Sequence, residues 1–324
     1  MKLLENKRIL FICPNFYNYH TEIKQTLEGL GAQVDFYEDM GNSYKDKALA
    51  KNPQQLKAYK EKHLKSILQK ASQYSYDFLF VVRGELLEPF FITEIKQQHP
   101  NITCLMYQWD AIKFNDYTAY LKLFDQVFTF DREDFEKYQG QIQYLPLFFI
   151  KNYEQAAATD ITQDIDILFV GGWHSDRFEL LKACQKFAQK EGLSYYFWLY
   201  LPFLYYFKRI VQGKLQYANF VKWSPLTHQQ SQALFARSNC IFDIEIPNQS
   251  GLTMRTLEAL GSGKKLITTN TYITQESFYK PEVIHVIDRD KPSFVKDFIK
   301  NPHEPLNMQD YSLESWVKHI FQHK

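Results

Sequence analysis

Hydrophobic and polar positions alternate in blocks along the chain. Short apolar runs predict buried strands, and between them apolar residues recur at helical spacing, most regularly over His20–Leu30 and Pro53–Ser72. This rhythm is typical of a parallel sheet with helices on both faces. In the first part of the chain, we expect strands at Arg8–Cys13, Gln33–Tyr37, Asp77–Val82, Ile102–Tyr107, Gln126–Phe130 and Gln143–Leu145.

The rhythm breaks at residues 151–163, which are polar and have no clear period, and then it restarts. We therefore predict a domain at 1–150, a linker at 151–163, a second domain at 164–305 and a terminal segment at 306–324 that returns to the first domain. Two doubly wound α/β domains predict a ligand cleft where strands end. The restarted pattern predicts strands at Asp166–Val170, Tyr195–Leu201, Cys240–Ile244, Lys265–Thr269 and Val283–Ile287, and helices at Ser175–Glu191, Thr227–Arg237, Leu252–Gly261, Pro292–Lys300 and Ser312–His323.

Composition narrows the class of protein. The chain has 324 residues, 45% of them hydrophobic, which fits a folded protein of about two domains. The net charge of +1 gives no reason to expect a nucleic-acid partner. Four widely spaced cysteines, three of them in apolar runs, predict core residues and not a disulfide or zinc framework. The N-terminal run has charges inside its apolar stretch and predicts a strand, so we expect a cytoplasmic protein.

Aromatic residues make up 17% of the chain and gather between Tyr195 and Lys222. The longest apolar run, Tyr195–Phe207, is broken by Pro202 and is too short to span a bilayer. One interpretation is peripheral contact with the inner face of a membrane, with aromatic residues at the interface and Lys208, Arg209, Lys214 and Lys222 on the headgroups. The alternative is a buried strand followed by a helix that packs on the sheet.

The segment Asp243–Asn270 carries the clearest chemistry. A buried strand is followed by a polar loop, and Gly251 is expected to open a helix that places Arg255 and Glu258 on one stripe. The helix start and the guanidinium suit a diphosphate, and the carboxylate could accept hydrogen bonds from two adjacent hydroxyls such as those of a ribose. The alternative is an ordinary surface ion pair at i,i+3 spacing.

This segment also resembles a known family. The run SGLTMRTLEALGSGKKLITT resembles the nucleotide-sugar segment of GT-B glycosyltransferases, and with FYKPEVIHVIDRD it looks like CgeB-like and bacterial capsule or lipopolysaccharide glycosyltransferases. The resemblance implies a GT-B architecture of two Rossmann-like domains facing a central cleft, with Glu258 on the ribose and Arg255 on the diphosphate. Many retaining relatives carry a second glutamate where this chain has Ser250. The implied donor contacts are Ser250, Gly251, Leu252, Thr253, Arg255 and Glu258.

A second phosphate candidate is the Gly171–Gly172 step, which follows a predicted strand. Glycine allows close approach of the backbone to a ligand, and a helix start follows. A simple tight turn is the alternative. In enzymes that resemble this chain, the corresponding turn lies near the donor.

Three strand ends in the first domain are candidates for the acceptor side. Sugar transfer needs a base for the acceptor hydroxyl or positive groups for the leaving diphosphate. Asp110 is the first candidate base, because the similar family has a Trp-Asp step at this strand end; a helix cap or structural carboxylate is the alternative. His20 and Glu85 are second candidates. Arg83 could bind an anionic acceptor or pair with Glu85, and the expected sugar contacts are Tyr17, Tyr19, Arg83 and Trp109.

Two D-x-D triplets, Asp164–Asp166 and Asp288–Asp290, are interpreted as solvated acidic turns, so no metal and no cofactor are expected. The resemblance implies a glycosyltransferase that moves a sugar from a nucleotide-sugar donor to a glycan or lipid-linked acceptor in bacterial surface polysaccharide synthesis. Two alternatives remain: a nucleotide-sugar epimerase of the same fold, and a non-catalytic protein that binds glycans or a partner.

Overall fold

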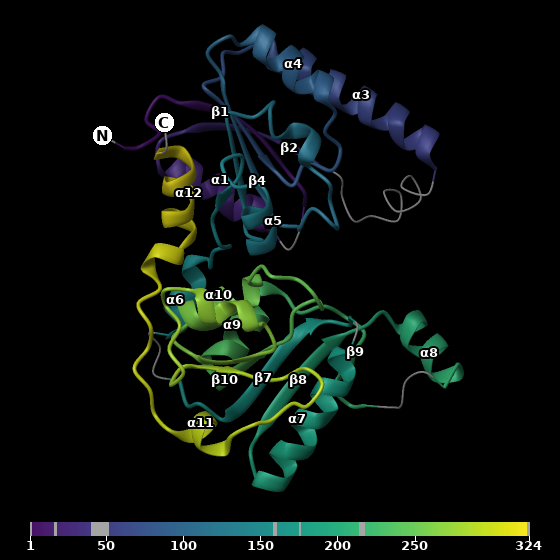
Figure 1. Cartoon of the computed structure of the whole chain (residues 1–324), viewed down its shortest axis with the longest axis vertical. Helices are drawn as coiled ribbons and strands as arrows, with labels where there is room; N and C mark the ends of the chain where they lie inside the picture. Colours follow the sequence, from purple (N-terminus) through teal and green to yellow (C-terminus); the bar gives the residue numbers. More distant parts are fainter. Residues whose placement is uncertain are drawn as a thin grey trace. The chain divides into compact units, whose positions relative to one another are not determined.

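The computed structural model describes residues 2–15, 18–39, 52–157, 161–174, 176–213 and 218–322 (Figure 1). The chain forms two compact units: unit 1 is Met1–Leu147 with Leu313–Lys324, and unit 2 is Phe148–Ser312. Each unit contains one six-stranded sheet in which all strand pairs are parallel. The prediction of two doubly wound parallel-sheet domains is therefore confirmed.

The sheet of unit 1 has the order β2-β1-β3-β4-β5-β6. The strand order reverses beside β1, so the carboxyl ends of β1 and β3 flank a topological switch point, where doubly wound sheets bind ligands. The strands of unit 1 are β1 (Arg8–Cys13), β2 (Gln33–Glu38), β3 (Phe78–Val82), β4 (Thr103–Gln108), β5 (Gln126–Thr129) and β6 (Gln143–Tyr144), and its helices are α1 (Tyr19–Gly29), α3 (Pro53–Ala71), α4 (Pro89–Gln98), η1 (Thr118–Tyr120), α5 (Arg132–Lys137) and α12 (Leu313–Gln322).

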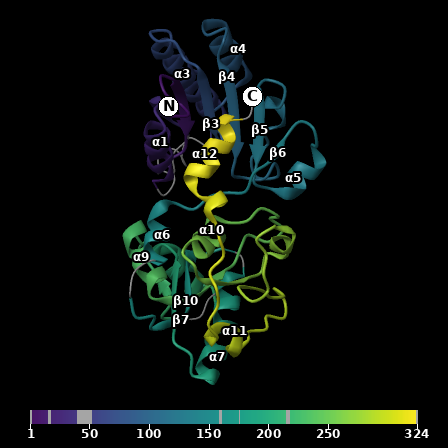
Figure 2. The same cartoon turned by 90° about the vertical axis from the view of Figure 1, so that its left-hand side faces the viewer.

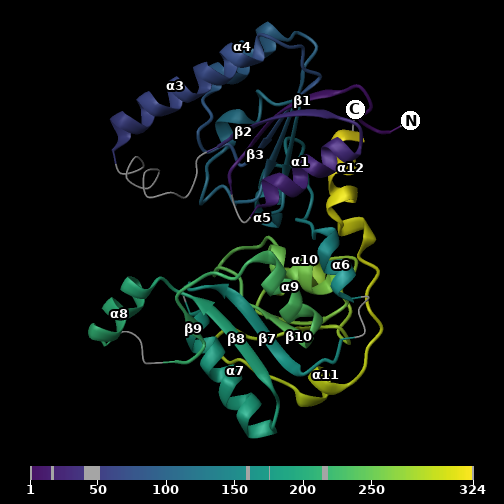
Figure 3. The ribbon, with the colours of Figure 1, turned by 180° about the vertical axis from the view of Figure 1, so that it is seen from behind.

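Helices cover both faces of this sheet. Alternate strand residues such as Leu79 and Val81 share a core with α3 and α4. On the opposite side, the Trp316 ring of α12 meets Tyr107 edge-on at 4.6 Å between centroids, and the Phe321 ring lies 5.4 Å from Phe80. Figure 2 shows α12 lying across the strands, and Figure 3 shows α1 beside it, in agreement with their contacts. Leu313, Trp316 and Ile320 of this terminal helix are all buried.

The sheet of unit 2 has the order β12-β11-β10-β7-β8-β9, and here the switch point lies between β7 and β10. Its strands are β7 (Ile165–Gly172), β8 (Tyr195–Tyr200), β9 (Val221–Lys222), β10 (Ser238–Asp243), β11 (Lys265–Thr268) and β12 (Ile284–Val286). Its helices are α6 (Lys151–Ala157), α7 (Arg177–Glu191), α8 (Phe203–Val211), α9 (His228–Ala236), α10 (Met254–Gly261), η2 (Thr271–Gln275), α11 (Lys296–Lys300) and η3 (Gln309–Tyr311).

Most of unit 2 is closely packed, but α8 is not. The helices α7 and α11 share one core with alternate residues of the central strands, and the intervening strand residues Leu168 and Ile241 are also buried. Helix α8 stands out from the sheet (Figure 1). None of the helices in the described part of the chain has the length and apolar character needed to cross a membrane.

The structure differs from the prediction in three local respects. The expected linker begins with helix α6, whose Tyr153 is buried in unit 2, because one aromatic residue in a polar stretch is enough to dock a short helix. The helix predicted at Pro292–Lys300 is confined to Lys296–Lys300. The aromatic stretch does form strand β8, with Phe197 and Leu199 buried, but in the helix after it Tyr206 is buried in the core while Phe203, Leu204 and Phe207 are exposed. The four cysteines are free and buried, as predicted.

Candidate functional site

The carboxyl end of β7 contains the two adjacent glycines. Both lie in the last two strand positions and not in a turn beyond the strand. A Cβ at Gly172 would meet no atom within 4 Å, whereas one at Gly171 would come within 3.0 Å of the Phe169 ring. Gly172 therefore leaves open space beside the switch point, whereas a side chain at Gly171 would crowd the Phe169 ring.

Arg177, in the first turn of α7, joins the two strands at this switch point. Its Nη1 donates to the Gly172 carbonyl at 2.9 Å, and its Nε donates to the Ile244 carbonyl at 2.7 Å. Burial lowers the pKa of the guanidinium, and Asp243 partly offsets this effect. Sequence analysis missed Arg177. The sequence shows an arginine five residues after Gly172, which is a signal that could have been used. Its contact with the end of β10 follows only from the strand order, in which β10 lies beside β7.

Helix α10 begins at Met254, two residues after the predicted start at Leu252. Thr253 has extended backbone angles and is the N-cap, and its hydroxyl accepts a hydrogen bond from the Thr256 amide. The hydroxyls of Thr253 and Thr256 both donate to Asp243, at 2.8 and 2.6 Å. The buried Asp243 carboxylate therefore ties the end of β10 to the start of the helix.

The loop before α10 is fixed in place. Ser250 and Leu252 are both buried, with exposed fractions of 2% and 1%. The side-chain amide of Asn270, at the end of β11, donates to the Gly251 carbonyl at 3.2 Å. Any ligand contact from Leu252 would therefore come from its backbone.

Arg255 and Glu258 form an ion pair, with Nη1 and Oε2 3.1 Å apart. The pair is not the surface pair considered as the alternative, because the Glu258 side chain is only 2% exposed and that of Arg255 is 23% exposed. The guanidinium lies over the Phe235 ring of α9. Burial raises the pKa of Tyr153 of α6, the nearby Glu258 raises it further, and Arg255 lowers it. Glu258 could contact a ribose only if the residues that cover its carboxylate moved away. The i,i+3 spacing in the sequence gave no sign of this burial.

A second cluster at this sheet edge was also missed. Arg289, which follows β12, forms an ion pair with Asp176 at 2.7 Å. It forms a second ion pair with the buried Glu245, which lies beyond β10. The Thr269 hydroxyl donates to the same Glu245 carboxylate. Burial raises the pKa of Glu245, although Thr269 and Arg289 oppose that shift. Four segments distant in sequence thus meet at one edge.

The interpretation as a solvated acidic turn is wrong for Asp166, which is buried in strand β7, but it is confirmed for Asp288 and Asp290, which are exposed after β12. Asp166 is buried and accepts hydrogen bonds from Ser194 and Asn239, and Lys300 pairs with it. Asp288 accepts hydrogen bonds from the backbone amides of Asp290 and Lys291. Within the described residues, no three His, Cys, Asp or Glu side chains gather to hold a metal ion. Metal-independent chemistry stays a prediction.

In unit 1, the carboxyl end of β3 has an unusual backbone. Arg83 has φ 68° and Gly84 has φ 73°, so two consecutive residues are left-handed. Such a conformation in a non-glycine residue persists only where the surroundings fix it. The Arg83 carbonyl accepts from the Gln108 side-chain amide at 2.7 Å and from Asn115 at 3.3 Å, which holds the turn.

This turn brings together three of the predicted residues. The Arg83 Nε lies 2.8 Å from Asp110, and its Nη2 lies 3.0 Å from Glu85. Burial raises the pKa of Asp110, Arg83 lowers it, and Glu85 adds to the increase. Asp110 is therefore a partly buried carboxylate with a raised pKa and one cationic neighbour, at the end of β4.

The other predicted residues of unit 1 are His20, Tyr19, Trp109 and Tyr17, and the ion pairs of the cluster join Arg83, Glu85 and Asp110. The His20 ring stacks on Phe36 at 5.0 Å, and burial lowers its pKa. Tyr19 begins α1 and is 5% exposed, which does not favour the predicted sugar contact, because its ring faces the interior. Trp109 is half-buried beside Asp110. Tyr17 lies outside the described residues.

No family model matches the chain, and no curated protein matches it in sequence. Among solved structures, it is similar to the UDP-GlcNAc 2-epimerase from Methanocaldococcus jannaschii, with 9% identity over 98% of this chain and 100% of that chain, and a TM-score of 0.57. The UDP-GlcNAc 2-epimerase from Neisseria meningitidis, bound to UDP-GlcNAc, gives 10% identity, 98% and 100% coverage, and a TM-score of 0.56.

The N-terminal domain of trehalose-6-phosphate phosphatase from Candida albicans gives 11% identity over 99% of this chain and 94% of that chain, with a TM-score of 0.56. At such identities the likeness concerns the fold alone. With the two parallel sheets, it assigns the chain to the GT-B architecture of two Rossmann-like domains.

Proposed function

We propose that this protein is a glycosyltransferase that uses a nucleotide-sugar donor bound by unit 2. The observation that carries the proposal is the construction of the β7–β10 switch point. There Gly172 leaves space, the partly buried Arg177 cation spans both strand ends, and Asp243 fixes the start of α10. Doubly wound sheets bind nucleotides at this position, and helix starts favour phosphate groups.

Each donor residue has a distinct role in this proposal. The backbone at Gly171–Gly172 and at Gly251–Thr253 approaches the diphosphate, and Arg255 stabilises the charge of the leaving group. Glu258 accepts hydrogen bonds from the ribose hydroxyls once Arg255 turns from it to the phosphates. In this exchange the Arg255 cation gains phosphate oxygens and the Glu258 carboxylate gains hydroxyl donors, so both groups keep hydrogen-bond partners, as burial requires.

Unit 1 supplies the acceptor chemistry in the same proposal. The acceptor oxygen bonds to the anomeric carbon as the bond from that carbon to the diphosphate oxygen breaks, and the hydroxyl proton passes to Asp110. A raised carboxylate pKa strengthens the base, and the neighbouring Arg83 guanidinium favours its ionised form. Neither step assigns a role to a metal or cofactor.

The acceptor we propose is a glycan or lipid-linked sugar of a bacterial surface polysaccharide, such as a capsule or lipopolysaccharide. This part rests on the resemblance of the Asp243–Asn270 segment to CgeB-like enzymes. A cytoplasmic enzyme working at the inner face of a membrane fits such an acceptor.

Calorimetric titration with nucleoside diphosphates tests the donor site. Arg255→Ala and Glu258→Ala should each abolish binding, a loss of at least about 100-fold given the strength of charged hydrogen bonds. Arg237→Ala is the matched control, because Arg237 precedes β10 at the opposite edge of the same sheet and pairs with Asp164. Unchanged affinity in both test variants rules out the donor-site assignment, and no binding to the wild type favours a non-catalytic role.

A nucleotide-sugar epimerase is the second candidate. The two UDP-GlcNAc 2-epimerases match this chain over their full lengths, which favours it specifically. An epimerase converts its sugar nucleotide without an acceptor. Incubation with UDP-GlcNAc alone, followed by NMR of the sugar, separates the candidates: a new epimer identifies an epimerase, whereas a transferase leaves the donor's configuration unchanged.

A further inference from the structure

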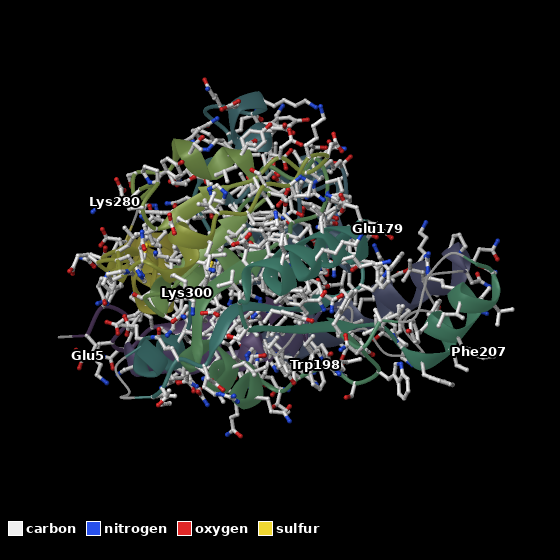
Figure 4. All side chains as sticks on the ribbon, turned by 90° about the horizontal axis from the view of Figure 1, so that it is seen from below. Glu5, Glu179, Trp198, Phe207, Lys280 and Lys300 are labelled. Carbon is white, nitrogen blue, oxygen red and sulfur yellow. The ribbon has the colours of Figure 1, made fainter. Side chains whose placement is uncertain are left out.

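Helix α8 exposes its apolar face. Leu204 is 78% exposed, Val211 69% and Phe207 58%, and at 100° per residue these side chains share one face with Phe203. Figure 4 labels Phe207 on the part of unit 2 that stands out from the sheet. Helices on globular proteins normally bury such a face, and a contiguous exposed apolar patch marks an interaction site.

The opposite side of α8 attaches it to unit 2. Tyr206 is 4% exposed, and its hydroxyl accepts a hydrogen bond from the Ala218 amide at 3.3 Å. The Arg209 guanidinium lies over the Trp173 ring, 3.8 Å from its centroid. The helix is therefore held with its apolar face outward, next to the residue that follows Gly172.

Trp223 enlarges the apolar face. It is 57% exposed, and its ring meets that of Phe203 edge-on at 5.1 Å. Phe203 in turn lies 6.2 Å from the Phe207 ring. Aromatic side chains in this number and arrangement form a platform that can enter the headgroup region of a lipid layer.

The charge around the platform indicates the kind of partner. Between Glu191 and Asp243 the sequence contains no acidic residue, whereas Lys208 follows Phe207 and Lys222 precedes Trp223. Lysine is depleted at protein–protein interfaces but is favoured beside anionic headgroups, where its stem lies along apolar surface and its ammonium stays in water. We propose that α8, with Trp223, docks unit 2 onto an anionic lipid surface.

Vesicle flotation tests this docking without any sugar nucleotide, so its result is independent of the proposed transferase activity. The wild type should bind vesicles that contain phosphatidylglycerol, bind pure phosphatidylcholine more weakly, and detach as salt rises. Leu204→Ser/Phe207→Ser should weaken binding at least about tenfold, since two apolar anchors are lost. Phe114→Ser is the matched control, because Phe114 is 54% exposed in unit 1.

A charge variant keeps the test decisive if the double variant folds poorly. Lys208→Glu should weaken binding to anionic vesicles but not to neutral ones, whereas Lys190→Glu on the exposed side of α7 should leave both unchanged. Failure of the wild type to bind, or equal losses in the Phe114→Ser control, overturns the proposal. So does a dimer in sedimentation velocity that Leu204→Ser/Phe207→Ser dissociates, because the occupant is then a second copy.

Discussion

The carboxyl ends of the two sheets carry polar clusters of different construction. In unit 1, a strained backbone turn at Arg83 and Gly84 presents one cation to two carboxylates, Glu85 and Asp110. In unit 2, arginine side chains reach across strands: Arg177 bonds the carbonyl groups of Gly172 and Ile244, and Arg289 pairs with Glu245. The first cluster depends on backbone conformation, and the second depends on side-chain ties.

This difference has a chemical consequence. Glu85 and Asp110 outnumber their single arginine, which suits proton acceptance. The ties in unit 2 keep guanidinium groups and a helix start close to one switch point, which suits a phosphate-bearing ligand. Two sheets of the same class can therefore support different chemistry, because the residues after the strands, and not the strands, supply the groups.

The largest expected effect is on the backbone of unit 1. Gly84→Ala should lower the free energy of unfolding by about 2–5 kcal/mol, because left-handed strain and overpacking combine. An added Cβ would lie 2.5 Å from Leu87 Cδ1, and Leu87 is buried. Urea denaturation provides the measurement.

Gly140→Ala is the control for that change. Gly140 has φ 81° and open space around it, so it should show strain alone, a loss of about 1–2 kcal/mol. Equal losses in the two variants would mean that the turn at Arg83 is not tightly fixed by its packing.

An intermediate effect is expected for the ties of unit 2. Asp243→Ala removes the acceptor of two hydroxyl groups and leaves the fully buried Thr256 hydroxyl without that acceptor, which should cost about 1–3 kcal/mol of stability. Affinity for a nucleoside diphosphate should fall as well, since the start of α10 loses its attachment. Thermal unfolding and calorimetry measure the two effects.

Thr256→Val tests the same tie from the other side. It should destabilise by about 1 kcal/mol and show coupling with Asp243→Ala in a double-mutant cycle. Strictly additive losses would show that the two residues do not stabilise each other.

The smallest effect concerns pH. The raised pKa of Asp110 means that its contribution to stability is present below the ordinary carboxyl value of 3.8 and is lost as pH rises through the raised value. Because Arg83 lowers this pKa, Arg83→Met should extend the loss to higher pH, and Asp110→Asn should abolish it. Unfolding free energies measured across the acid range give the comparison, with Lys96→Met as a surface control. An identical pH profile in Arg83→Met would contradict the assignment.

Much of the fold and part of the site could be predicted because they depend on local pattern. The runs that became β1, β3 and β11 are buried on both faces, so their apolar character alone marks them. The pairing of Arg255 with Glu258 follows from i,i+3 spacing on a helix. The pairing of Arg83 with Glu85 was one of the two alternatives predicted for Arg83, and it is confirmed. Asp110 lies close to this pair because parallel strands end at one edge of the sheet.

The rest required tertiary structure. Arg177, Glu245, Thr269 and Arg289 come from separate segments, and only the order β12-β11-β10-β7 makes their strand ends neighbours. Glu258 meets Tyr153, from a segment that resembles a linker, because helix α6 contacts α10, and the outward face of α8 depends on which side Tyr206 anchors. Sequence by itself determined the elements and the neighbours within each element, because periodicity is local. Strand order and docking decided which groups meet and which stay exposed, because those depend on contacts between distant segments.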